Sequence, residues 1–197
     1  MTDTLNIMLV GVGGQGTLLA ADVIALVGME AGLDVKKSEV HGMAQRGGSV
    51  TSHVRWGETV SSPLIPLGSA DFVVAFERIE ALRHLQMLGP KGVVLVNEYG
   101  IVPVTVTSGG ATYPSQEEET GVYDATGIEP VYVDAVCMAQ NLGNARANNV
   151  VILGALSSYL DVPVETWLKV IAERVPARFV ELNQQAFHAG RNAIKSA

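Results

Sequence analysis

The sequence predicts an α/β domain in which helices cover a mostly parallel sheet and the C-terminal portion is helical. Three observations predict this fold. Apolar runs of strand length alternate with helical patterns over the first hundred residues. A glycine fingerprint, "GVGGQG" at residues 11–16, joins the first apolar run to the first helical pattern. Helical patterns then dominate from residue 135 onward. The strand–helix–strand order indicates right-handed crossovers, and therefore parallel strands.

The first elements follow from periodicity. Residues 6–12 form a continuous apolar run, which is typical of a strand buried on both faces. Over residues 15–31, leucines and valines recur every three or four positions, which predicts a helix that Gly32 is placed to end. The segment "LDVKKSEV", residues 33–40, predicts a second strand. The segment "VTSHVRW", residues 50–56, alternates like a strand with one face in water.

We expect core strands at 71–76 and 92–97, with a helix at 79–88 that Gly89-Pro90 ends. The run "VPVTV" at 102–106 predicts a further strand. The acidic run "QEEET" indicates a solvated loop over 114–127, and "EPVYVDA" predicts a return to strand. Helical spacing then predicts helices at 135–142, 148–160, 164–174 and 179–195. We therefore expect one domain over residues 1–197, of which 135–197 is mainly helical.

Composition excludes several classes of protein. The formal net charge is −7, which argues against a general nucleic-acid binder because such binders need a clustered positive surface. The single cysteine, Cys137, excludes an intrachain disulfide, a zinc ribbon and an iron–sulfur cluster held by this chain alone. No apolar stretch approaches the roughly 20 residues of a membrane helix, and the N-terminus lacks the cationic flank of a signal peptide. We expect a cytoplasmic protein that binds no metal.

The glycine fingerprint has the spacing G-x-G-x-x-G, which in Rossmann units lets the backbone approach a pyrophosphate at a helix N-terminus. Dinucleotide-binding units also carry an acidic residue about 20 positions further on, at the end of the second strand. Glu39 is the candidate for that role here. Two hypotheses stay open at this point. The turn either serves only the architecture or binds phosphate through the segment Gly11, Gly13, Gly14, Gln15 and Gly16.

A second cluster, "SEVHGMAQRGGSV", begins at the C-terminal edge of the second predicted strand, where open α/β sheets place their ligands. Its glycines would let backbone amides approach a ligand. Arg46 could bind a carboxylate or phosphate through two nitrogens, and His41 could titrate near neutrality. The alternative is a solvated surface loop. We favour residues that face a ligand or a partner's active site: Glu39, His41, Gly42, Gln45, Arg46, Gly47, Gly48 and Ser49.

Four segments together resemble one family. They are, in chain order, "GVGGQGTLLAAD", "SEVHGMAQRGGSVTSHVRWG", "NNVVILGALSSYL" and "ELNQQAFHAGR". They resemble the gamma-type subunit or domain of 2-oxoacid:ferredoxin oxidoreductases, the group that acts on pyruvate and ketoisovalerate. The second segment most resembles the beta subunit of indolepyruvate:ferredoxin oxidoreductase. The resemblance implies a three-layer α/β/α, Rossmann-like sandwich without a nicotinamide cofactor.

The resemblance also implies a function. Such complexes oxidatively decarboxylate a 2-oxoacid, here favoured to be an aryl pyruvate such as indolepyruvate, to an acyl-CoA and reduce ferredoxin. Thiamine diphosphate, Mg and the iron–sulfur clusters are expected on a catalytic partner subunit, and coenzyme A is a candidate ligand of this chain. We expect a subunit that is inactive alone and binds neither nucleic acid nor membrane. Self-association and individual catalytic residues stay open.

Two alternatives remain at this stage. One is a stand-alone Rossmann-type oxidoreductase that binds a nucleotide, motivated by Gly11, Gly13, Gly16 and Glu39. The other is a non-enzymatic assembly module whose glycine-rich loop only docks a partner. The sequence contains neither a nucleophile elbow G-x-S-x-G nor a zinc motif H-E-x-x-H.

Overall fold

The computed structural model of the chain describes residues 4–41, 48–102, 104–107, 109, 110 and 112–195. Its centre is a six-stranded sheet with the strand order β2-β3-β1-β4-β5-β6. Strands β1, β4, β5 and β6 are parallel, whereas β3 is antiparallel to both of its neighbours, β1 and β2. The bounds are Leu5–Val12 for β1, Asp34–His41 for β2, Ser49–Gly57 for β3, Ala70–Ala75 for β4, Leu88–Asn97 for β5 and Val131–Val133 for β6.

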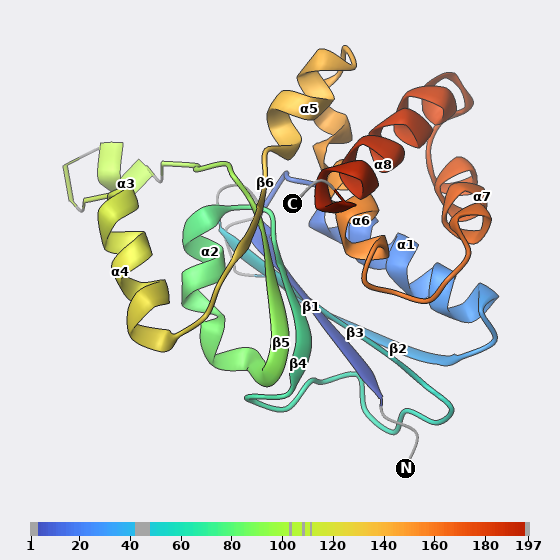
Figure 1. Cartoon of the computed structure of the whole chain (residues 1–197), viewed down its shortest axis with the longest axis horizontal. Helices are drawn as coiled ribbons and strands as arrows, with labels where there is room; N and C mark the ends of the chain where they lie inside the picture. The colour runs from blue at the N-terminus through green and yellow to red at the C-terminus, as the bar shows by residue number, and fades with distance from the viewer. Residues whose placement is uncertain (1–3, 42–47, 103, 108, 111, 196–197) are drawn as a thin grey trace.

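Helices cover both faces of the sheet, which confirms the predicted α/β/α architecture (Figure 1). One side carries α2 (Arg78–Arg83) and α4 (Gln116–Thr126), with the short helix α3 (Val104–Thr107) beside α4. The other side carries α1 (Thr17–Glu30), α5 (Ala135–Asn141), α6 (Asn148–Ser157), α7 (Val164–Arg174) and α8 (Val180–Lys195). Three 3-10 turns connect these elements: η1 (Leu85–Met87), η2 (Ala145–Ala147) and η3 (Ala177–Phe179).

Strand β1 divides the core. Ile7 and Leu9 belong to the hydrophobic cluster under α1, α6 and α8, whereas Met8 and Val10 belong to the cluster under α2 and α4. All four side chains are buried. Because successive side chains of a strand point to opposite faces, a strand covered on both sides must be apolar at every position. The continuous apolar run of β1 satisfies that requirement.

The helical C-terminal portion packs without space between two of its helices. A Cβ atom at Gly154 of α6 would lie 2.0 Å from the carbonyl oxygen of Phe187, and one at Gly190 of α8 would lie 1.8 Å from that of Val151. The two backbones therefore touch at these glycines. Helix α6 is buried on all sides, which explains why its sequence is apolar over several consecutive positions.

Two predicted elements are wrong. Residues 104–107 form the short helix α3, which overlaps the segment predicted as a strand over 102–106. Residues 116–126 form α4 within the segment predicted as a loop over 114–127. The start of α4 is a capping box, in which the Ser115 hydroxyl accepts a hydrogen bond from the Glu118 N–H and the Glu118 carboxylate accepts one from the Ser115 N–H. The S-x-x-E spacing was present in the sequence and marks a helix start.

The helix predicted at 79–88 is too long. Helix α2 ends at Arg83, and β5 already begins at Leu88, which pairs with Ala70 of β4. The register between β4 and β5 shifts after this first pair. Gly89 and Pro90 lie in that irregular part, where a strand tolerates both residue types.

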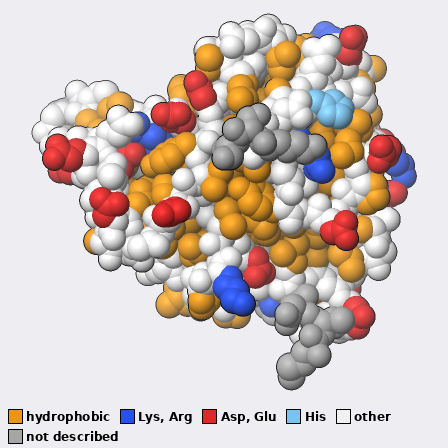
Figure 2. Space-filling view, in the orientation of Figure 1, with side chains coloured by type: hydrophobic (Ala, Val, Ile, Leu, Met, Phe, Trp, Pro, Cys, Tyr) orange, Lys and Arg blue, Asp and Glu red, His pale blue; other side chains and the backbone are white. Residues whose placement is uncertain are grey.

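On the face shown in Figure 2, hydrophobic side chains gather in the middle of the molecule, around the position of β6 in Figure 1, and acidic side chains are scattered around them. Within the described part of the chain, no helix combines the length and apolarity that a membrane crossing requires.

Candidate functional site

The two sequence motifs meet at the carboxyl ends of the parallel strands. The N–H of Gly13, in the turn after β1, donates a hydrogen bond of 2.9 Å to the carbonyl oxygen of Gly48. Val12, the last residue of β1, pairs with Ser49, the first residue of β3. The second motif therefore links β2 to β3, and its ends lie beside the glycine turn. Ligands of open α/β sheets bind at this edge.

The glycines of the turn meet different requirements. Gly14 has a φ of 105° and Gly16 a φ of 80°, which L side chains rarely adopt. A Cβ atom at Gly16 would also lie 2.5 Å from Nδ2 of Asn149. A Cβ atom at Gly11 would lie 2.8 Å from Cγ2 of Thr17 and 2.9 Å from Oε1 of Gln15. Close packing of the turn thus explains Gly11 and Gly16 without any ligand.

Gln15 has a structural task. Its Oε1 accepts a hydrogen bond of 2.7 Å from the N–H of Val12, and its Nε2 donates one of 2.7 Å to the carbonyl oxygen of Phe76. The amide group therefore joins the ends of β1 and β4. Asn97 at the end of β5 donates to the same Phe76 oxygen over 3.2 Å. These amides hold three strand ends in register beneath the turn.

A pocket of about 810 Å³ opens beside the turn. One wall is the glycine turn and the N-terminus of α1, which no side chain caps. The first N–H groups of an uncapped helix, together with its dipole, favour an anion. The complete lining is Gly13, Gly14, Gln15, Gly16, Leu19, Tyr99, Ile101, Val136, Gln140, Ala145, Arg146, Asn148 and Asn149.

Two side chains add donors to this pocket. Asn149 is 5% exposed, and its Oδ1 accepts a hydrogen bond from the N–H of Val150, whereas its Nδ2 faces Gly16 at the pocket. Arg146 is exposed at the pocket, and its guanidinium forms no ion pair within the described ranges of the chain. Neither residue is among the site residues predicted from the sequence. Arg146 lies in η2 and Asn149 in the first turn of α6, and only the fold brings both to α1.

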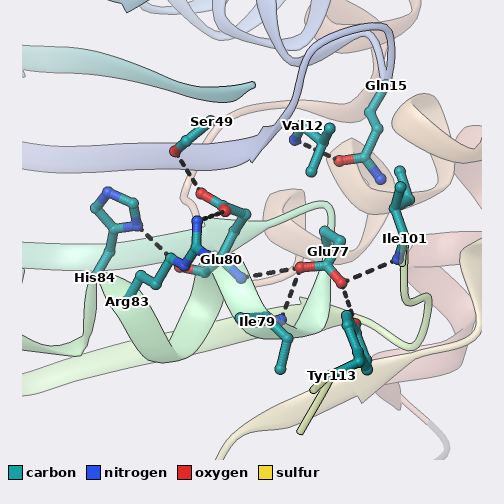
Figure 3. A network of polar contacts seen from close by, with 10 residues as sticks. All are labelled: Val12, Gln15, Ser49, Glu77, Ile79, Glu80, Arg83, His84, Ile101 and Tyr113. Carbon is teal, nitrogen blue, oxygen red and sulfur yellow. Dashed lines mark hydrogen bonds and ion pairs between the residues drawn. The ribbon is translucent and has the colours of Figure 1, made fainter. Parts of the chain in front are cut away.

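The predicted residues of the second motif are placed as follows. His41 is the last residue of β2, and its side chain lies outside the described residues, as do Gly42, Gln45, Arg46 and Gly47. The Ser49 hydroxyl donates a hydrogen bond of 2.5 Å to Oε2 of Glu80 on α2. Glu80 is buried and also accepts from Arg83 over 2.9 Å (Figure 3). This hydrogen bond thus connects Ser49, the first residue of β3, to α2.

Glu39 does not have the position of a ribose-binding carboxylate. In a dinucleotide-binding unit the acidic residue ends the strand next to β1, but here β3 separates β2 from β1. The Glu39 carboxylate accepts from Nζ of Lys37 over 2.6 Å, and the same ammonium group pairs with Asp22 of α1. Glu39 therefore belongs to an ion-pair cluster against α1.

A buried carboxylate after β4, Glu77, is not among the residues predicted from the sequence. Glu77 follows β4 and is 2% exposed, and its two oxygens accept four hydrogen bonds, as Figure 3 shows. The donors are the N–H groups of Ile79, Glu80 and Ile101 and the hydroxyl of Tyr113. Burial, reinforced by Glu77, raises the pKa of the Tyr113 hydroxyl well above its usual value. The position of Glu77 directly after a core strand was the sequence signal that could have identified it as a candidate site residue.

Metal ligands are not gathered here. Among the described residues, no three His, Cys, Asp or Glu side chains form a group that could hold a metal ion. Cys137, the only cysteine of the chain, is exposed on α5.

Comparisons with known proteins find relatives that match over nearly the whole chain. The model of the family "Pyruvate ferredoxin/flavodoxin oxidoreductase" matches residues 6–193. The chain is 43% identical over 190 residues to indolepyruvate oxidoreductase subunit IorB of Archaeoglobus fulgidus, covering 95% of this chain and 94% of the relative. The crystal structure of pyruvate oxidoreductase subunit PORC from Thermotoga maritima matches with a TM-score of 0.71 and 25% identity, over 96% of each chain.

A longer protein contains the same fold. The 2-oxoglutarate:ferredoxin oxidoreductase of Magnetococcus marinus, solved with 2-oxoglutarate, coenzyme A and succinyl-CoA bound, matches with a TM-score of 0.76 and 21% identity. The match covers 100% of this chain and 32% of that chain. The extent of the family match and the identity to IorB lead to one conclusion: this chain belongs to the pyruvate ferredoxin/flavodoxin oxidoreductase family.

Proposed function

We propose that this chain is the subunit without clusters of a complex that oxidatively decarboxylates a 2-oxoacid to an acyl-CoA and reduces ferredoxin. An aryl pyruvate such as indolepyruvate is the favoured substrate, because the relatives with 34–43% identity are named indolepyruvate oxidoreductase subunits. One observation carries the proposal: this chain belongs to the family and has a donor-lined pocket at the carboxyl edge of its sheet. Such a chain can bind an anionic substrate but needs a partner for electron transfer.

Iron–sulfur clusters do not fit this chain. A cluster requires several cysteine thiolates, and the sequence has one cysteine. The described residues also bring together no group of three metal-ligating side chains. We assign the clusters, thiamine diphosphate and magnesium to a catalytic partner subunit and derive no step through them here.

Coenzyme A is the ligand that we assign to the pocket. Its phosphates suit the uncapped N-terminus of α1, the Nδ2 of Asn149 and the guanidinium of Arg146. The apolar side chains of Leu19, Ile101 and Val136 suit the less polar parts of the molecule. The neighbour from Magnetococcus, which has the same fold, is described with coenzyme A bound. In this role the chain orients the acyl acceptor and leaves bond making to the partner's active site.

The second motif is the proposed approach to that active site. Two of its residues, His41 and Gly48, lie at the same sheet edge as the glycine turn. We propose that Glu39, His41, Gly42, Gln45, Arg46, Gly47, Gly48 and Ser49 face the partner's active site or the path of coenzyme A. Arg46→Ala tests this placement in the assembled complex. Loss of turnover with intact assembly supports it, whereas weakened assembly with unchanged turnover supports a docking role only.

Reconstitution tests the proposal as a whole. The chain is purified alone and together with its catalytic partner, and reduction of a viologen dye is followed with indolepyruvate, phenylpyruvate, pyruvate and ketoisovalerate. We expect no reduction by the chain alone, and coenzyme A-dependent reduction by the complex that is fastest with an aryl pyruvate. Activity of the chain without a partner would overturn the assignment, and a preference for pyruvate would overturn the substrate class.

Calorimetry separates this function from that of a stand-alone nucleotide enzyme. The chain is titrated with coenzyme A, NAD, NADP and FAD. We expect binding of coenzyme A alone, because β3 holds Glu39 away from the end of β1, where a ribose would need it. Micromolar binding of NAD without binding of coenzyme A would favour the nucleotide enzyme.

A further inference from the structure

Glu77 bonds to more than its own helix. Its Oε2 accepts hydrogen bonds from the N–H groups of Ile79 at 2.8 Å and Glu80 at 3.0 Å, which caps α2. Its Oε1 accepts from the N–H of Ile101 at 3.1 Å and from the hydroxyl of Tyr113. The two oxygens thus bind two different parts of the chain. Figure 3 shows Glu77 between them.

The second part of the chain is a wall of the pocket. Tyr99 and Ile101 line the pocket together with the glycine turn. The N–H of Arg78 donates to the carbonyl oxygen of Tyr99 over 3.1 Å, so this wall is attached to the start of α2 at a second point. The Tyr113 hydroxyl lies against Gly100, where a Cβ atom would approach it to 2.7 Å. One carboxylate therefore determines where Ile101 and Tyr113 lie.

A cap alone does not explain a buried glutamate at this position. Serine, threonine, asparagine and aspartate are the preferred N-cap residues, because a short side chain reaches the first N–H groups of a helix. A fully buried carboxylate is costly unless donors surround it. Here one donor, the Ile101 N–H, belongs to the pocket wall, and another, the Tyr113 hydroxyl, lies against the neighbouring Gly100. Burial also raises the pKa of the Tyr113 hydroxyl, which keeps its proton available for Glu77.

We propose that Glu77 is a positioning residue, which acts through Ile101 and Tyr113 to hold the wall of the pocket in the conformation that accepts coenzyme A. The identity of the ligand, coenzyme A, rests on the proposed function. The role of Glu77 in holding the wall does not depend on it. The charge and the cap of α2 are retained in Glu77→Asp, whose side chain is one methylene too short to reach both sets of donors. Tyr113→Phe removes one of the two donors to Oε1 and leaves the carboxylate in place.

Hydrogen exchange of the full chain measures the wall directly. We expect the Ile101 amide to exchange about tenfold faster in Glu77→Asp and in Tyr113→Phe, because a hydrogen bond to a buried charge is lost or weakened. The amides of Ile79 and Glu80 should keep their protection in Glu77→Asp. Glu80→Gln is the matched control, since that buried carboxylate bonds to Ser49 and Arg83 and leaves the Ile101 amide unchanged.

Kinetics of the reconstituted complex measure the consequence. We expect the KM for coenzyme A to rise about tenfold in both variants while kcat changes by about twofold at most, because the wall acts on binding. Glu98→Gln, which neutralises an exposed carboxylate after β5, should match the wild type. Unchanged Ile101 exchange, or an unchanged KM, in both Glu77→Asp and Tyr113→Phe overturns the inference. If Arg146→Ala also leaves the KM unchanged, the assignment of coenzyme A to the pocket fails instead, and the exchange result still decides the role of Glu77 in the wall.

Discussion

The N–H of Gly13 donates a hydrogen bond of 2.9 Å to the carbonyl oxygen of Gly48. This bond joins the glycine fingerprint to the hairpin that carries the second motif, although the two residues are far apart in the sequence. The strand order explains the contact, because β3 pairs directly with β1 and brings its first residue to the end of that strand. The two motifs therefore form one edge, and the pocket lies beside it.

Arg146→Ala should weaken the binding of coenzyme A. The guanidinium is exposed at the pocket, so we expect the KM of the complex for coenzyme A to rise about fivefold at low salt and by less at high salt, where screening weakens exposed charges. Steady-state kinetics at two ionic strengths measure the effect. Lys91→Ala serves as the control, because it removes an equal charge from the first half of β5, away from the carboxyl ends of the strands where the pocket lies. Equal effects of the two substitutions would argue against a local role for Arg146.

Ser49→Ala should destabilise the chain by about 1–3 kcal/mol, because it leaves an oxygen of a buried carboxylate without its donor. The lost bond is the one from the Ser49 hydroxyl to Glu80. Urea unfolding measures the free energy of unfolding. Ser61→Ala, at an exposed serine, should change it by less than about 0.5 kcal/mol. A loss no larger than that of the control would show that the Ser49–Glu80 bond adds nothing to stability.

His53 should make stability depend on pH. Burial, and then the positive charges of His84 and Arg55, lower the pKa of its imidazole below the ordinary 6.5, and its Nδ1 accepts a hydrogen bond from the N–H of Ile65. The unfolded state therefore binds more protons between the lowered value and 6.5, so stability is present above this window and is lost as the pH falls through it.

The test for His53 is unfolding between about pH 8 and about pH 5, a range in which histidine titrates. His53→Asn offers an Oδ1 acceptor to Ile65 but does not titrate, so its loss of stability at low pH should be smaller than that of the wild type. His188→Gln, at an exposed histidine, should retain the wild-type dependence. A steeper loss in His53→Asn than in the wild type would refute the assignment.

Gly154→Ala and Gly190→Ala should each destabilise the chain by about 3 kcal/mol or more, because the added methyl meets a backbone carbonyl that cannot move without separating α6 from α8. The distances of 2.0 Å and 1.8 Å are well below van der Waals contact. Gly121→Ala, in α4, has nothing within 4 Å and should stabilise by about 0.5–1 kcal/mol through helix propensity. Thermal and urea unfolding of the three variants should show this difference in sign.

Local pattern was sufficient for the elements that are covered by the core or bounded by glycine. The continuous apolar run of β1 and the periodic leucines and valines of α1 report burial directly, and Gly32 has the positive φ that ends α1. Helix α7 was predicted with the observed bounds, Val164–Arg174. The prediction failed at α4, because an acidic run is typical of a solvated loop. Only the spacing of Ser115 and Glu118 in the capping box indicates that a helix starts there.

Tertiary structure alone decided which segments are neighbours. The pattern of "VTSHVRW" indicates a strand but not its partner, so the insertion of β3 between β1 and β2, which separates Glu39 from the glycine turn, was invisible. The same holds for the Nδ2 of Asn149 over Gly16, for Arg146 at the pocket and for the bonds from Glu77 to Ile101 and Tyr113. Periodicity indicates which positions along one helix or strand are buried. Contacts between distant elements depend on the packing of the whole chain, which no short stretch of sequence contains.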